Sequence, residues 1–180
     1  MKLIKLIGII LLITILTSCR SENKNKLNEK TYPVIIVEFS HDKFHHSDTT
    51  TLTIRENDSI NTHLFGLEND GENEIIMDML FEINPNNESE ILIFTIPAKL
   101  ISKKEYNVGD KQFLVRKYYY DEEGVADEEG FFFTLDNRII AFNSRAWNLY
   151  RFYKYENSNA DLFLKNDTTD FFDYRNKKLE

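Results

Sequence analysis

The sequence of 180 residues has one cysteine, six glycines and three prolines. A single thiol cannot form an intramolecular disulfide, so the fold must rest on packing and hydrogen bonds. With so few glycines, a glycine-rich loop that cradles phosphate groups is not expected. The G-x-S-x-G and H-E-x-x-H motifs are also absent, which removes two common hydrolase signatures. The sequence therefore contains no catalytic motif, and we expect a protein that is not an enzyme.

The single cysteine stands at the end of an N-terminal export signal. Lys2 and Lys5 give a positive start, and Leu6–Leu16 form an almost wholly apolar run of eleven residues. As a helix, this run would rise only about 16 Å, which is too short for a bilayer core of about 30 Å. Positive charge, a short apolar run and then small residues are the pattern of a cleaved secretory signal.

The stretch Leu16-Thr17-Ser18-Cys19 resembles the lipobox of bacterial lipoproteins, in which a leucine and two small residues precede an invariant cysteine. The resemblance implies that residues 1–18 are removed and that Cys19 carries lipid on its sulfur and on its new N-terminus. Two or more acyl chains hold a protein firmly on a membrane, at about 0.8 kcal/mol per buried methylene. We therefore expect a lipid-anchored protein of the bacterial envelope, on a periplasmic or surface face.

Removal of eighteen residues leaves 162, which suits one domain with a buried core. Loss of Lys2 and Lys5 takes the net charge from −8 to −10, which disfavours nucleic acid as a partner. Residues 19–32 are polar, so we expect a flexible tether there. A β-rich domain should span residues 33–155. Residues 156–180 should form a loosely packed polar extension, with or without a short helix.

Alternation of apolar and polar residues predicts strands through most of the domain. Asn84–Asn87, Gly109-Asp110 and Asp136-Asn137 are predicted turns, and the last pair is typical of a hairpin. We expect a mainly β domain, built as a single antiparallel β-sheet or as a sandwich. The predicted strands are Val34–Phe39, Thr51–Ile54, Glu74–Ile83, Ile91–Ile96, Phe113–Tyr120, Phe131–Leu135 and Arg138–Phe142.

In two segments the residue pattern is compatible with either a helix or a strand. Glu74–Ile83 alternates like a strand, but its second face is apolar enough for a helix. Ala146–Tyr155 fits both periods, and we favour a strand because the segment directly follows a predicted hairpin. We also expect Pro97 to end the strand that begins at Ile91, since proline cannot donate a ladder hydrogen bond.

Three of the four histidines, His41, His45 and His46, lie within six residues. If this segment were helical, imidazoles four residues apart could face one metal ion, with Asp42 or Asp48 completing the ligand set. The alternative is a solvated loop between two strands that binds no metal. The sequence as a whole requires no cofactor.

Six carboxylates are concentrated in the ten residues 121–130. The candidate calcium ligands among them are Asp121, Glu123, Asp127 and Glu129, because calcium prefers oxygen donors. Their spacing does not match the twelve-residue calcium loop. The alternative is an acidic hairpin loop whose charges are solvated by water.

Aromatic residues are abundant, and Trp147, Tyr150 and Tyr153 are the candidates for a binding surface. An exposed row of aromatic rings could stack on sugar rings or dock a protein partner. Neighbouring residues of a strand point to opposite faces of the sheet, so a second layer that covers these rings is the alternative.

The leading hypothesis is a non-enzymatic β domain that is tethered to a membrane through Cys19 and acts by binding or as a structural part. Its partner would be an unknown protein or glycan. A second hypothesis is an immunity or inhibitor lipoprotein that neutralises a basic toxin or enzyme, motivated by the mature charge of −10. A third is a carboxylate-based hydrolase, which requires two acidic side chains facing each other in a concave pocket.

Overall fold

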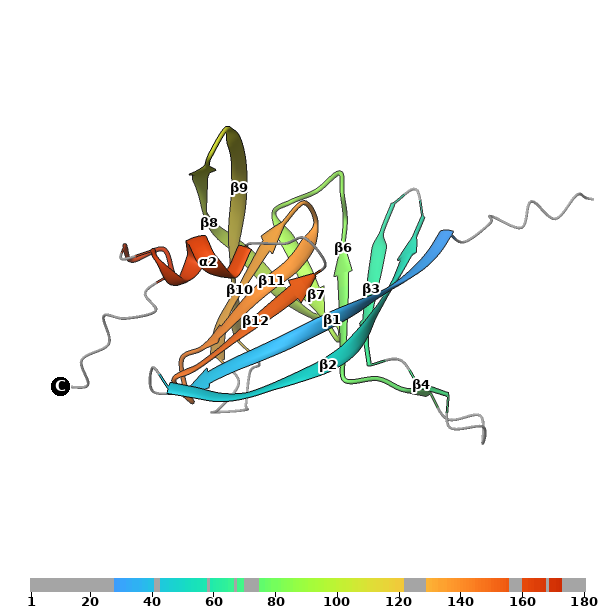
Figure 1. Ribbon diagram of the computed structural model, residues 1–180. Coiled ribbons are helices and arrows are strands. Elements are labelled where there is room, and N and C mark those ends of the chain that lie inside the picture. The colour runs from blue at the N-terminus through green and yellow to red at the C-terminus, as the bar shows by residue number, and fades with distance from the viewer. Residues whose placement is uncertain are drawn as a thin grey trace, which may run out of the picture.

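The strands of this protein close into a barrel (Figure 1). Apolar side chains at alternate strand positions point into its interior and are buried there. The computed structural model describes residues 28–40, 43–57, 59–66, 68–69, 75–121, 129–155, 160–167 and 169–172. The lipobox and Cys19 lie outside these ranges. Within the ranges, no helix has both the length and the apolar character needed to cross a membrane.

Ten strands form the barrel wall: β1 (Asn28–Ser40), β2 (Lys43–Glu56), β3 (Asn61–Phe65), β6 (Met79–Ile83), β7 (Glu90–Ile93), β8 (Ile96–Val108), β9 (Lys111–Asp121), β10 (Glu129–Leu135), β11 (Arg138–Ser144) and β12 (Leu149–Tyr155). A separate hairpin, β4 (Glu68–Asn69) and β5 (Ile75–Ile76), lies in sequence between β3 and β6. One described helix, α2 (Ala160–Lys165), follows the last strand.

Each wall strand pairs antiparallel with the next wall strand along the chain. β12 then pairs with β1, so the sheet has no unpaired edge strand. The predicted mainly β class is confirmed. Of the two arrangements left open, the single antiparallel sheet is the one that forms, and it is closed on itself rather than folded into a sandwich.

The barrel interior is packed with aromatic rings. Phe65, Phe81 and Phe132 form a chain of edge-to-face contacts, with ring centroids 5.7 and 5.3 Å apart. Tyr153 extends inward from β12, and its ring centroid lies 5.1 Å from that of Phe65. Burial raises the pKa of Tyr153 to about 12. Large rings supply much apolar area per residue, which suits a chain without disulfides.

The turns follow the sequence signals closely. Asp136 and Asn137 join β10 to β11 with φ angles of 49° and 58°, the left-handed pair that a tight hairpin requires. Gly109, with a φ of 59°, joins β8 to β9 as predicted. Both positions hold residue types that tolerate a positive φ, so these turns could be predicted from sequence.

The strand predicted to run from Ile91 to Ile96 is corrected. β7 ends at Ile93, Phe94 and Thr95 form a turn, and β8 begins at Ile96 with Pro97 inside it. Pro97 stands at the second position of β8, beside the turn, where the missing N–H group removes at most one ladder bond. Proline therefore marks the start of a strand here and not its end.

The structure also corrects the start of the first strand and decides between helix and strand in the two ambiguous segments. β1 begins at Asn28, inside the expected tether of residues 19–32, because residues 28–33 pair with residues 51–56 of β2. Glu74–Ile83 contains no helix among its described residues, which form β5 and β6 with a break between them. Ala146–Tyr155 forms a turn followed by β12, so the favoured strand is confirmed from Leu149 onward.

Residues 160–172 pack against the outer face of the barrel, where α2 lies beside the wall (Figure 1). Leu164 and Phe172 are fully buried, and the Phe172 ring lies 4.9 Å from that of Phe133 and 5.5 Å from that of Phe152. The described part of the expected extension, residues 156–180, is therefore not loosely packed. The outer faces of the last wall strands are apolar, and a few apolar residues in a polar segment are enough to cover them.

The up-and-down strand order places the connections at two opposite rims (Figure 1). We call one the distal rim; it carries the end of β1, the Phe94-Thr95 turn and the turn at residues 145–148. The other, the proximal rim, carries the start of β1 and the turns at Gly109 and at residues 136–137. The chain thus enters the barrel at the proximal rim.

Candidate functional site

Two histidines and one glutamate converge at the distal rim. His45 and His46 lie near the start of β2, and Glu38 lies near the end of β1. Glu38 pairs with His46 whereas Phe39 pairs with Phe44, so His45 is the extra residue of a β-bulge. A bulge sets two residues of one strand against one residue of its partner and redirects their side chains. Two consecutive histidines can therefore face one carboxylate.

The ring nitrogens lie close to each other and to that carboxylate. His45 Nδ1 is 2.7 Å from His46 Nδ1, within hydrogen-bond distance. Oε1 of Glu38 is 3.2 Å from Nδ1 of His46 and 3.9 Å from Nδ1 of His45. The two histidine side chains are 64% and 50% exposed, whereas that of Glu38 is only 7% exposed. The cluster is therefore open to solvent on its histidine side.

Arg151 holds the glutamate from the barrel side. It lies opposite Glu38 in the ladder between β1 and β12. Its Nε donates to Oε2 of Glu38 at 2.7 Å, and its Nη2 donates to the same oxygen. Burial of a carboxylate is costly unless hydrogen bonds from a cationic partner compensate for the lost water. Because Arg151 occupies Oε2, the free oxygen Oε1 is the one that faces the histidines.

The structure brings together two of the three histidines named as metal-ligand candidates, and His41 lies outside the described residues. Neither expected geometry is right: His45 and His46 lie on a bulged strand, not on a helix or in a loop. Glu38 and Arg151 were not among the candidate site residues predicted from the sequence. Each is a charged residue within an otherwise largely apolar strand, and this signal could have found them, because such charges are buried only when paired.

The acidic segment offers no calcium cluster among its described residues. Asp121 and Glu129 are ladder partners of β9 and β10, while Glu123 and Asp127 lie outside the described ranges. The Tyr119 hydroxyl donates to Glu129 at 3.0 Å and lies 3.4 Å from Asp121. Arg145 forms an ion pair with Glu129 at 2.9 Å. These two carboxylates already have protein partners.

The proposed aromatic row does not form one surface. Tyr150 and Tyr153 are each 1% exposed, because Tyr150 lies under Phe172 on the outer face and Tyr153 lies inside the barrel. Trp147 alone of the three is exposed, in the turn before β12. Phe44, which the sequence analysis did not single out, is 61% exposed and lies at the same distal rim. The two exposed rings therefore lie at the distal rim, which also carries the Glu38 cluster, and not along β12.

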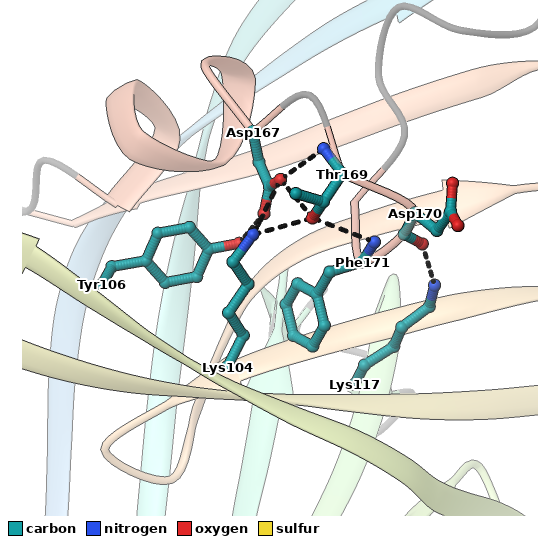
Figure 2. Close-up of polar contacts among 7 residues, drawn as sticks. All are labelled: Lys104, Tyr106, Lys117, Asp167, Thr169, Asp170 and Phe171. Atoms are coloured by element: carbon teal, nitrogen blue, oxygen red, sulfur yellow. Dashed lines mark hydrogen bonds and ion pairs between the residues drawn. The ribbon is translucent and has the colours of Figure 1, made fainter.

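A second polar cluster joins the C-terminal segment to the long β8–β9 hairpin (Figure 2). Asp167 accepts hydrogen bonds from Lys104 Nζ at 2.8 and 3.0 Å and from the Tyr106 hydroxyl. It also accepts from the backbone N–H of Thr169 at 2.8 Å. Burial by itself raises the pKa of Asp167, but these hydrogen bonds outweigh it and lower the pKa from 3.8 to about 2. The cluster holds the C-terminal segment against the β8–β9 hairpin. Both carboxylate oxygens of Asp167 already accept hydrogen bonds, so the cluster is structural.

We expect Asp167→Asn to lower the free energy of unfolding by about 2 kcal/mol at pH 7, because charge-assisted hydrogen bonds are replaced by weaker ones. In the wild-type protein, the stability that ionised Asp167 contributes should be complete above pH 4 and lost as the pH falls toward 2. The reason is that the pKa of Asp167 is lower in the folded state than in the unfolded state. Urea unfolding at several pH values measures both effects. Asp170→Asn is the matched control, because Asp170 offers Lys117 its backbone carbonyl. Equal losses in both variants would contradict the assignment.

Among the described residues, Glu38, His45 and His46 form the one group of three potential metal ligands whose donor atoms all lie within 4.8 Å of one another. No protein-family model, no curated protein and no solved structure matches this chain.

Proposed function

We propose that this chain is a lipoprotein of the bacterial envelope, anchored to a membrane through lipid on Cys19, whose barrel is a non-enzymatic binding module. The observation that carries the proposal is the order of Lys2, Lys5, a short apolar run and the Leu16-Thr17-Ser18-Cys19 lipobox. Such a chain would leave the membrane at Cys19 and enter the barrel at Asn28.

The topology supports different roles for the two rims, with the proximal rim near the membrane and the distal rim available for binding. Only eight residues separate Cys19 from Asn28, and an extended chain of that length spans at most about 30 Å. The proximal rim is thus the one kept near the membrane. The distal rim carries the Glu38 cluster with the exposed rings of Phe44 and Trp147. Exposed aromatic rings beside polar groups are typical of surfaces that bind proteins or glycans.

A second candidate, an immunity or inhibitor lipoprotein that neutralises a basic toxin or enzyme, is favoured by the mature net charge of −10. The same anchor and the same distal rim would serve it. A toxin reading frame beside this gene would support this second candidate, and a gene without such a neighbour would count against it.

We expect Cys19→Ser to abolish lipid attachment and to move the protein from sedimented membranes to the soluble fraction. Ser18→Ala is the matched control, since it keeps a small residue in the lipobox and should leave the protein on the membrane. Mass spectrometry of the membrane form should show acyl chains on Cys19 and no residues before it. An unmodified Cys19, or a Cys19→Ser protein retained at the wild-type level, would refute the proposal.

A further inference from the structure

We infer that Glu38, His45 and His46 form a binding site for one divalent transition-metal ion of the zinc class. This site is independent of the anchor on Cys19, because its three residues lie on β1 and β2 of the barrel. Two imidazoles and one carboxylate are a donor set that suits zinc, copper or nickel. Calcium and magnesium prefer oxygen donors, so the same set discriminates against them.

The donor separations are close to those that one metal ion imposes. Zinc–ligand bonds of about 2.0–2.2 Å in tetrahedral geometry place neighbouring donors about 3.3 Å apart. The separation between Glu38 Oε1 and His46 Nδ1 is 3.2 Å, near this value. The other two separations, 2.7 and 3.9 Å, bracket it. His45 belongs to both of those pairs, so a modest rotation of one exposed side chain equalises the three distances.

The bulge makes this convergence specific to the backbone of β2. In a regular strand, His45 and His46 would point to opposite faces, and only one of them could reach Glu38. With His45 as the extra residue, both Nδ1 atoms face Oε1. At 2.7 Å the two Nδ1 atoms lie within hydrogen-bond distance of each other, and the tautomer decides which of them donates. A metal ion bound by both Nδ1 atoms would need the lone pair of each, so any proton on these atoms would be released to solvent.

Arg151 acts as the supporting group of the site. Its two hydrogen bonds fix the Glu38 carboxylate and leave Oε1 as the donor, which is the role that outer partners of metal ligands commonly perform. The histidine side of the cluster remains open to solvent. Three protein ligands leave a fourth position of a tetrahedral ion for water or for a group of a bound partner. The site would therefore add a metal-mediated contact to the distal rim.

Isothermal titration of the mature lipidated protein in detergent, freed of metal with a chelator, tests the inference. We expect one zinc ion per chain to bind and calcium to give no saturable signal at the same concentrations. His45→Ala and His46→Ala should each weaken zinc binding at least tenfold, and the double variant should abolish it. Both side chains are half exposed or more, so the barrel should keep its wild-type circular dichroism spectrum.

Ser47→Ala is the matched control, because Ser47 directly follows His46 on the same strand but lies outside the ligand group. It should keep the zinc affinity within twofold of wild type. Absence of saturable zinc binding would overturn the inference, and so would unchanged binding in the double histidine variant. Neither result bears on membrane anchorage, which the Cys19→Ser fractionation reports separately.

Discussion

Replacing Phe172 with alanine is expected to lower the free energy of unfolding by about 3–5 kcal/mol, the usual range for a fully buried phenylalanine. Phe172 is 1% exposed, and its ring contacts that of Phe133 on β10 and those of Tyr150 and Phe152 on β12. The substitution would open a cavity and loosen the segment that covers the outer face of the barrel. Urea unfolding followed by circular dichroism measures the loss.

Phe44→Ala is the matched control for this substitution. It deletes the same side chain from a wall strand, but Phe44 is mostly exposed, so we expect a change of about 0.5 kcal/mol or less. A loss below about 1 kcal/mol for Phe172→Ala would show that the C-terminal segment does not seal the barrel wall. Equal losses in the two variants would lead to the same conclusion.

Lowering the pH from 7 to 4 is expected to destabilise the barrel by about 3 kcal/mol through His63 alone, at about 1.4 kcal/mol per unit of pKa shift. His63 lies on β3 between Ile54 and Phe81 and is 1% exposed. Its Nδ1 has no hydrogen-bond partner in the described part of the chain. Burial, with a smaller contribution from Arg138, lowers its pKa from 6.5 to about 4.

The sign follows from which state binds the proton first. Below pH 6.5 the unfolded chain protonates His63, whereas the folded barrel keeps it neutral until about pH 4. Stability is therefore complete above pH 6.5 and falls as the pH decreases toward 4. Urea midpoints between pH 4 and 8 measure the slope.

His63→Leu should remove most of that slope above pH 5, because leucine fills a similar volume and carries no titrating group. At pH 7 this substitution should leave the free energy of unfolding nearly unchanged, because the Nδ1 atom that it removes makes no hydrogen bond in the described structure. Leu64→Ile is the control, since Leu64 is a buried neighbour on β3 that carries no titrating group, and its replacement should leave the slope intact. A wild-type stability that stays constant between pH 7 and 5 would contradict the assignment.

The candidate site shows where sequence reasoning stops. The histidine run contributes two residues to the candidate cluster, but helical spacing suggested His41 and His45 as the facing pair. The described partner of His45 and His46 is Glu38, which a register shift between β1 and β2 brings within reach. No residue pattern in the sequence predicts the one-residue bulge at His45. A shift of one residue changes which face each side chain occupies.

The sequence alone determined the features that depend on neighbouring residues. Alternation of apolar residues predicted most wall strands, and Asp136-Asn137 predicted a turn because few residue types tolerate a positive φ. The lipobox is equally local, as a run of adjacent residues at the N-terminus. Such features need no knowledge of what lies across the sheet.

The tertiary structure decided everything that joins distant residues. Closure of the barrel pairs β1 with β12, and Glu38 meets Arg151 across a separation of 113 residues. The same closure buries Tyr150 and Tyr153 on opposite faces and creates the apolar outer wall that Phe172 covers. The physical reason is that the environment of a strand residue is set mostly by its cross-strand neighbours, and register selects these only when the sheet forms.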